Sequence, residues 1–188
     1  MSSSFDPHQS PSPLYPAQDR RFTPWKNGGG QTAEVLCVPT GSDLESFDWR
    51  ISTARVGQSG PFSRFVGIDR VLTILEGGAI RLQFASGLVV DLAQSSAPLS
   101  FSGEDACEAE LLGEALLDLN LMVRRPLEGA ILRSGEEVDP QGLLACYLFA
   151  LADLAEPALG RFDLLELPLI AQTVPDRALI LTVRRSAA

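Results

Sequence analysis

Apolar and polar positions alternate along most of this chain, and the 3.6-residue period of an amphipathic helix is scarce. The alternation is clearest in two segments, where successive side chains would point to opposite faces of a strand. In the first, residues 48–56, one face carries Trp49, Ile51, Thr53 and Arg55 and the other carries Asp48, Arg50, Ser52, Ala54 and Val56. In the second, residues 116–124, one face carries Leu117, Leu119, Leu121 and Val123 and the other carries Asp118, Asn120, Met122 and Arg124.

Further short strands are expected at intervals, separated by turn residues. Val71 to Leu75 and Ala79 to Phe84 are predicted to form a hairpin around the turn Glu76-Gly77-Gly78. Residues 143–152 fit a helix or a strand by periodicity, and Cys146-Tyr147-Leu148-Phe149 favours a strand. The remaining expected strands are 32–38, 88–93, 99–101, 107–112, 131–133, 162–167 and 178–184. Such spacing is typical of an all-β sandwich or barrel.

The chain has 188 residues, which suits one domain or two small lobes that share a core. Residues 1–16 are rich in Ser and Pro and are expected to form a disordered tail. The longest apolar run, Leu143 to Leu154, is too short to span a bilayer, so no membrane partner is expected. Cys37, Cys107 and Cys146 form no CxxC pair, which indicates reduced thiols and a cytoplasmic location.

Charge and histidine content narrow the chemistry. The net charge of −9 argues against a nucleic-acid partner. His8 is the single histidine and lies in the expected tail, so neither a histidine-ligated metal site nor a serine or cysteine nucleophile paired with histidine is expected. No acidic segment has the spacing of a calcium loop. The prediction is therefore a protein without metal or other cofactor.

Polar strand positions are the candidates for ligand binding, and they allow two interpretations. An amphipathic strand normally turns its polar face to water. In a barrel, the same face can line a cavity. Arg70 follows Gly67-Ile68-Asp69 and precedes an apolar strand, so it forms either a surface ion pair or a contact with an anion inside a cavity.

A glycine-rich segment, Trp25-Lys26-Asn27-Gly28-Gly29-Gly30, lies directly before the strand expected at 32–38. A phosphate-binding loop would open a helix instead, so nucleotide binding is not expected. The segment is either a tight turn or the shaped rim of a site. Trp25, Asn27, Gly28, Gly29 and Gly30 are assigned to the rim.

The chain resembles the HutD/Ves family in motifs that occur in the family's order. These are Pro24-Trp-Lys-Asn-Gly-Gly-Gly-Gln-Thr-Ala-Glu34, Phe47-Asp-Trp-Arg-Ile-Ser52, Gly60-Pro-Phe-Ser63, Gly67-Ile-Asp-Arg70, Leu75-Glu-Gly77, Asp118-Leu-Asn120 and Arg124-Arg125. The resemblance implies a cupin (RmlC-like jelly roll) β-barrel at 17–188, with two cupin-like lobes at about 17–113 and 114–188. It also implies a barrel that lacks the metal-binding histidines of other cupins. Family members are encoded with histidine-utilisation genes and are thought to limit the pathway by binding an intermediate such as urocanate or formiminoglutamate.

From the matching positions we expect a pocket that binds a small carboxylate. Arg70 and Arg50 would hold the anion, Thr32 and Asn120 would add neutral hydrogen bonds, and Glu34 and Asp48 would orient the arginines or accept from the ligand. The alternative is a metal-independent isomerase or hydrolase with Glu34 or Asp48 as the general base. A homodimer is possible, because apolar edge strands are expected.

Overall fold

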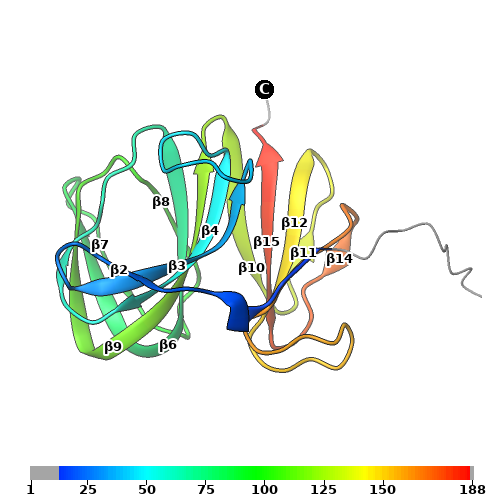
Figure 1. Cartoon of the computed structure of the whole chain (residues 1–188). Coiled ribbons are helices and arrows are strands. Elements are labelled where there is room, and N and C mark those ends of the chain that lie inside the picture. Colours follow the sequence, from blue (N-terminus) through cyan, green and yellow to red (C-terminus); the bar gives the residue numbers. More distant parts are fainter. Residues whose placement is uncertain (1–12, 187–188) are drawn as a thin grey trace, which may run out of the picture.

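The computed structural model describes residues 13–186, and their fold is all-β (Figure 1). Within this described part of the chain, strands form two main sheets and a small two-stranded one, and the helical structure consists of one 3₁₀ turn, η1 (Ala17–Asp19). Over the described residues, no helix is long and apolar enough to cross a membrane.

The larger sheet has eight strands. Six of them lie in the spatial order β2 (Thr23–Pro24), β3 (Gly30–Val38), β4 (Trp49–Val56), β9 (Cys107–Arg124), β6 (Ile68–Phe84) and β7 (Val89–Leu92), while β5 (Gly60–Pro61) pairs with β9 and β8 (Leu99–Ser102) pairs with β6. All of these pairings are antiparallel. The strand order leaves β2 and β7 at its ends, so backbone pairing does not close the sheet.

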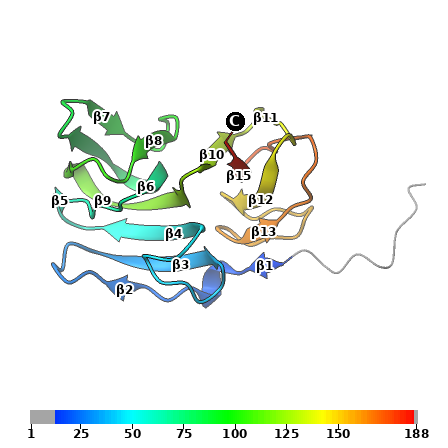
Figure 2. The same ribbon diagram turned by 90° about the horizontal axis from the view of Figure 1, so that it is seen from above.

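The second sheet has five antiparallel strands, in the order β1 (Leu14–Tyr15), β13 (Leu164–Glu166), β12 (Leu143–Ala150), β15 (Ala178–Arg185) and β10 (Leu127–Arg133). Beside it, β11 (Glu137–Val138) pairs with β14 (Gln172–Thr173). Figure 2 shows this sheet next to β3, β4 and β9 of the larger one. The N-terminal segment joins the two, because β1 pairs with β13 and β2 pairs with β3.

The largest apolar core lies between the two sheets. Buried residues of β4, β6 and β9, such as Ile51, Val71 and Leu121, contact buried residues of β12 and β15, such as Phe149 and Leu181. A second core lies on the opposite face of the larger sheet. It consists of Val56, Leu72, Ile74, Ile80, Leu82, Phe84, Leu92, Cys107, Ala109 and Leu116. The central strands of the larger sheet are therefore covered on both faces.

Three expectations need correction. The hairpin predicted at Glu76-Gly77-Gly78 is wrong, because β6 continues through it and pairs with β9 along its whole length. Two bulges bend β6 there, and Gly77 takes a φ of +84° that a side chain rarely adopts. A Cβ at Gly77 would lie 2.2 Å from the Ala115 carbonyl oxygen. The glycine is therefore needed because β6 and β9 approach closely here, and it does not form a turn.

The other two corrections concern boundaries. The expected division of the lobes at 113 and 114 falls inside β9, and the chain leaves the larger sheet only at Arg125-Pro126. In the expected tail, Leu14 and Tyr15 form β1. Residues 1–12, including His8, lie outside the described residues. The strand predicted at 143–152 is confirmed as β12.

Candidate functional site

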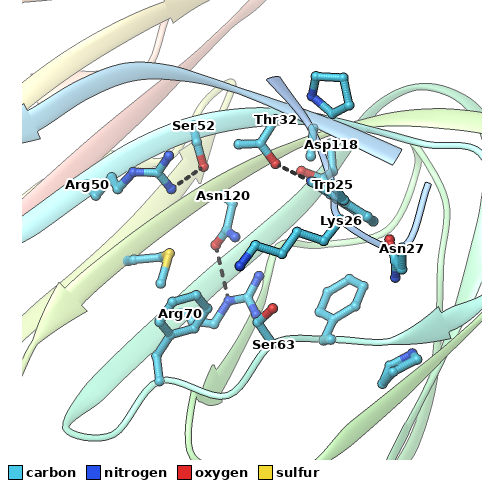
Figure 3. A pocket seen from close by; sticks show the side chains of 16 residues that line it. Trp25, Lys26, Asn27, Thr32, Arg50, Ser52, Ser63, Arg70, Asp118 and Asn120 are labelled. Carbon is cyan, nitrogen blue, oxygen red and sulfur yellow. Dashed lines mark hydrogen bonds between the residues drawn. The ribbon is translucent and has the colours of Figure 1, made fainter. Parts of the chain in front are cut away.

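A cavity of about 500 Å³ lies on the face of the larger sheet that points away from the second sheet. It borders the apolar core that contains Leu72 and Ile74. Side chains from the β2–β3 loop, six strands and the segment after β5 surround it (Figure 3). The lining residues are Pro24, Trp25, Lys26, Asn27, Thr32, Arg50, Ser52, Ala54, Pro61, Phe62, Ser63, Phe65, Arg70, Asp118, Asn120 and Met122.

Strand alternation explains why polar groups gather here. On β9, Leu119 and Leu121 pack against the second sheet, while Asp118, Asn120 and Met122 turn into the cavity. The β4 register places Ser52 opposite Asn120, and that pair also faces inward. The polar face of these strands therefore lines a cavity, which was the second of the two sequence interpretations.

Arg70 is a buried cation with little polar compensation. Its residue is 6% exposed, and its Nε donates a long hydrogen bond of 3.5 Å to Asn120 Oδ1. The guanidinium carbon lies 5.1, 5.8 and 5.1 Å from the ring centres of Phe62, Phe65 and Phe101. No carboxylate of the described residues lies within 4.0 Å of it. Burial lowers the pKa of Arg70 to about 10, so the group stays positive at neutral pH.

Asp118 is the buried acid of the cavity. Its residue is 3% exposed, and its Oδ1 has no hydrogen-bond partner among the described residues. Burial raises the pKa of Asp118 to about 7, although Arg70 and a backbone hydrogen bond at Ala54 both favour the charged form. Near neutral pH this carboxyl can therefore accept or hold a proton.

Two more cations border the cavity. Arg50 Nε lies 2.9 Å from Glu34 Oε2, and its side chain is 14% exposed against 51% for Glu34. The same guanidinium donates a 3.4 Å hydrogen bond from Nη1 to the Ser52 hydroxyl. Lys26 is exposed and extends from the β2–β3 loop over the site in Figure 3. Three cations thus face one buried acid, in a chain whose net charge is −9.

The rim is fixed by tryptophan and glycine. Trp25 Nε1 donates a 2.8 Å hydrogen bond to the Thr32 hydroxyl, which holds the indole at the edge of the cavity. A Cβ on Gly30 would lie 2.5 Å from the Arg55 carbonyl oxygen and 2.8 Å from the Trp25 ring, so only glycine fits. Asn27 Oδ1 accepts from the Gly29 backbone N–H and orders the loop.

The structure brings together Arg70, Arg50, Thr32 and Asn120, with Trp25 and Asn27 beside them. It does not bring in Glu34 and Asp48. Glu34 reaches Arg50 from a half-exposed position outside the lining, and Asp48 is exposed just before β4. Gly28, Gly29 and Gly30 shape the loop and are not among the lining residues.

Sequence reasoning did not select Asp118 and Ser52 as site residues, although both stand on the polar faces that alternation identified. Lys26 had a signal too, since it is the one lysine of the chain and lies in the glycine-rich motif. The aromatic residues around Arg70 had no such signal. Among the described residues, no cluster of three His, Cys, Asp or Glu side chains could hold a metal ion.

Curated relatives match part of the chain. An uncharacterized 21.2 kDa protein in the hutC 3′ region of Pseudomonas putida is 43% identical over 115 residues, which are 58% of this chain and 56% of that protein. Protein Ves of Escherichia fergusonii is 41% identical over 101 residues, 53% of this chain and 51% of that protein. The chain thus spans about half the length of the curated relatives it matches.

Solved structures match nearly the whole chain. HutD from Pseudomonas fluorescens SBW25, in a formate condition, is 27% identical with a TM-score of 0.78, over 93% of this chain and 99% of that one. A conserved protein of unknown function from Pseudomonas aeruginosa PAO1 is 27% identical with a TM-score of 0.73, over 95% and 100%. Oxalate decarboxylase of Bacillus subtilis shares the fold alone, at 9% identity and a TM-score of 0.61, over 95% and 78%. The fold is therefore cupin-like.

The HutD family itself matches residues 17–153, which include every residue that lines the cavity. The chain belongs to the HutD family.

Proposed function

We propose that this protein binds a small carboxylate in the cavity and that Arg70 is the main anion-binding group. The observation that carries the proposal is the state of this guanidinium: buried, positive, surrounded by phenyl rings and without a carboxylate within 4.0 Å among residues 13–186. A buried charge is costly unless it is paired. A ligand carboxylate would supply the partner, and a charge-assisted hydrogen bond to this buried guanidinium would be strong.

The other groups support an anion over a neutral or cationic ligand. Arg50 and Lys26 border the same space, so three cations line the cavity against one acid, Asp118, although the chain as a whole is acidic. Thr32, Ser52 and Asn120 add neutral polar groups of the kind that orient a small ligand. A volume of about 500 Å³ is within the range of small-molecule sites.

The biological role that fits is regulation of histidine utilisation through binding of an intermediate such as urocanate or formiminoglutamate. Support comes from the HutD family match and from the Pseudomonas putida relative in the hutC 3′ region. On the fold, we interpret the two sheets as two cupin-like lobes. The similarity to oxalate decarboxylase, which extends over 95% of the chain, supports this interpretation.

A thermal-shift panel of urocanate, formiminoglutamate, formylglutamate, histidine and formate tests the binding. A ligand at 100 times its Kd adds about 2.7 kcal/mol to the free energy of unfolding. For a chain of this size, that corresponds to a rise in Tm of about 5 to 10 °C. Arg70→Met removes the cation and keeps an apolar side chain of similar length beside the phenyl rings, and it should abolish the shift.

Arg81→Met is the matched control, because Arg81 lies on the same strand, β6, and pairs with Asp91 outside the cavity. It should leave the ligand-induced shift unchanged. The proposal fails if no carboxylate raises the Tm, or if Arg70→Met and Arg81→Met respond to the ligand as the wild type does.

Catalysis without a metal is a second candidate, and the buried acid Asp118 favours it. A carboxyl whose pKa is raised to about 7 suits general acid–base chemistry at neutral pH. Glu34 and Asp48 suit it less, since neither lines the cavity. Incubating each panel compound with the protein and following it by NMR would detect turnover. Turnover that Asp118→Asn abolishes would favour this candidate over binding alone.

A further inference from the structure

We infer that Asp118 selects ligands that carry an N–H donor in addition to the carboxylate. The inference rests on the proposed function, since it assigns the other end of the same ligand. Asp118 was not among the residues expected to bind ligand, and no hydrogen-bond donor of residues 13–186 uses its Oδ1.

The contacts of Asp118 leave one acceptor unused. Oδ1 is buried, lies in a side chain that lines the cavity, and has no hydrogen-bond partner among residues 13–186. Native proteins pair nearly all such atoms. Of the unpaired buried atoms among residues 13–186, Asp118 Oδ1 is the one whose side chain lines the cavity, so we assign its missing partner to a ligand. Ionised carboxylates accept and do not donate, so the complementary ligand group is an N–H or O–H.

Asp118 and Arg70 are neighbours that do not neutralise each other. The two charges interact through the cavity, yet no ion pair within 4.0 Å forms between them. If the two residues served only to stabilise the fold, we would expect the guanidinium and the carboxylate to form a direct ion pair. The open arrangement leaves the cation free for the carboxylate and the acid free for a donor.

The strand geometry sets the distance between the two ends. Asp118 and Asn120 lie two residues apart on β9, and this spacing is about 7 Å along a strand. Asn120 accepts the hydrogen bond from Arg70 Nε, so we place the anion end about this far from Asp118. The matching ligand class is a carboxylate with an N–H group about 5 to 7 Å away on a flat or extended frame.

The charges around Asp118 should make the preference for a carboxylate with an N–H over one without it strong. Arg70 on β6, Arg50 on β4 and Lys26 of the β2–β3 loop face the cavity with Asp118, while Glu34 on β3 is paired with Arg50. A carboxylate without a donor brings a second negative charge and leaves Asp118 unpaired. An N–H on the ligand removes that penalty and adds a charge-assisted hydrogen bond.

The test uses two acrylates of nearly equal shape that differ in one group: 3-(1H-pyrrol-3-yl)acrylate, which has the N–H, and 3-(furan-3-yl)acrylate, which has none. Calorimetric titration at pH 8 should give the wild type at least about tenfold higher affinity for the pyrrole compound. Tenfold corresponds to about 1.4 kcal/mol, near the lower end for a hydrogen bond to a charged group.

Asp118→Ala removes the acceptor and should reduce the preference to about twofold or less, with furan affinity kept or increased. Asp118→Asn keeps an uncharged oxygen and should give an intermediate preference. Melting curves of both variants check the fold. Equal wild-type affinities for the two acrylates would overturn the inference and leave carboxylate binding intact. Failure of both to bind the wild type would overturn the inference together with the proposed function.

Discussion

The replacement of Asp118 by asparagine should make the protein more stable, and more so as the pH rises. In the folded protein, burial raises the pKa of Asp118 from 3.8 to about 7. The folded state therefore holds a proton between about pH 4 and pH 7 that the unfolded chain has released. Because the folded state binds more protons in this window, the free energy of unfolding falls as pH rises through it.

The magnitude follows from the same values. The folded and unfolded pKa differ by about 3, and each unit is worth about 1.4 kcal/mol. Ionisation of Asp118 therefore costs up to about 4 kcal/mol above pH 7, and nothing below pH 3.8, where both states are protonated. Relaxation around the charge reduces this cost, so we expect about 2 to 4 kcal/mol.

Urea unfolding of the wild type and Asp118→Asn at pH 4.5 and pH 8 measures the effect. The variant's advantage should be larger at pH 8 by about 2 to 4 kcal/mol, because asparagine carries no charge at either pH. Any fixed cost of the amide cancels in this comparison. Asp48→Asn makes the same substitution at an exposed position outside the cavity and serves as the control. A difference between variant and wild type that is equal at both pH values would refute the reasoning.

Three further substitutions test the frame of the site. Gly30→Ala should destabilise the protein by about 1 to 3 kcal/mol in urea unfolding, because the new methyl would overlap Trp25. Thr32→Val removes the acceptor of the indole N–H and should cost about 1 kcal/mol; an unchanged tryptophan emission spectrum would count against that contact. Leu119→Ala, between the sheets, should cost about 2 to 5 kcal/mol, and a loss under 1 kcal/mol would contradict its place in the core.

Much of the architecture was predictable from alternation. The two faces of residues 116–124 are those of β9, with Leu119 and Leu121 against the second sheet and Asp118 and Asn120 in the cavity. The continuous strand through Glu76–Gly78 was not predictable in this way, because a glycine pair fits a turn and a bulge equally well. Pairing with β9, thirty to forty residues later, decides between them.

The site was predictable only in part, for a similar reason. Arg50 and Arg70 stand on different strands, and β9 lies between β4 and β6. Whether their side chains meet water or a cavity depends on long-range pairing that no local pattern contains. Glu34 illustrates the limit. It shares the strand face of Thr32, yet β2 pairs with β3 only at Gln31 and Thr32, so β3 is an edge strand at Glu34. There its carboxylate reaches Arg50 from a half-exposed position.

The buried charges of the cavity reduce the stability of the fold, and the proposed ligand recognition explains why they are there. Burial lowers the pKa of Arg70 and raises that of Asp118, so both groups lie where their charged forms are disfavoured. Contacts with the phenyl rings offset part of the cost at Arg70, but apolar residues at the two positions would satisfy the fold at least as well. Two opposite charges held apart in one cavity favour a ligand that carries both complements. Stability alone gives no reason for that separation, whereas recognition of such a ligand does.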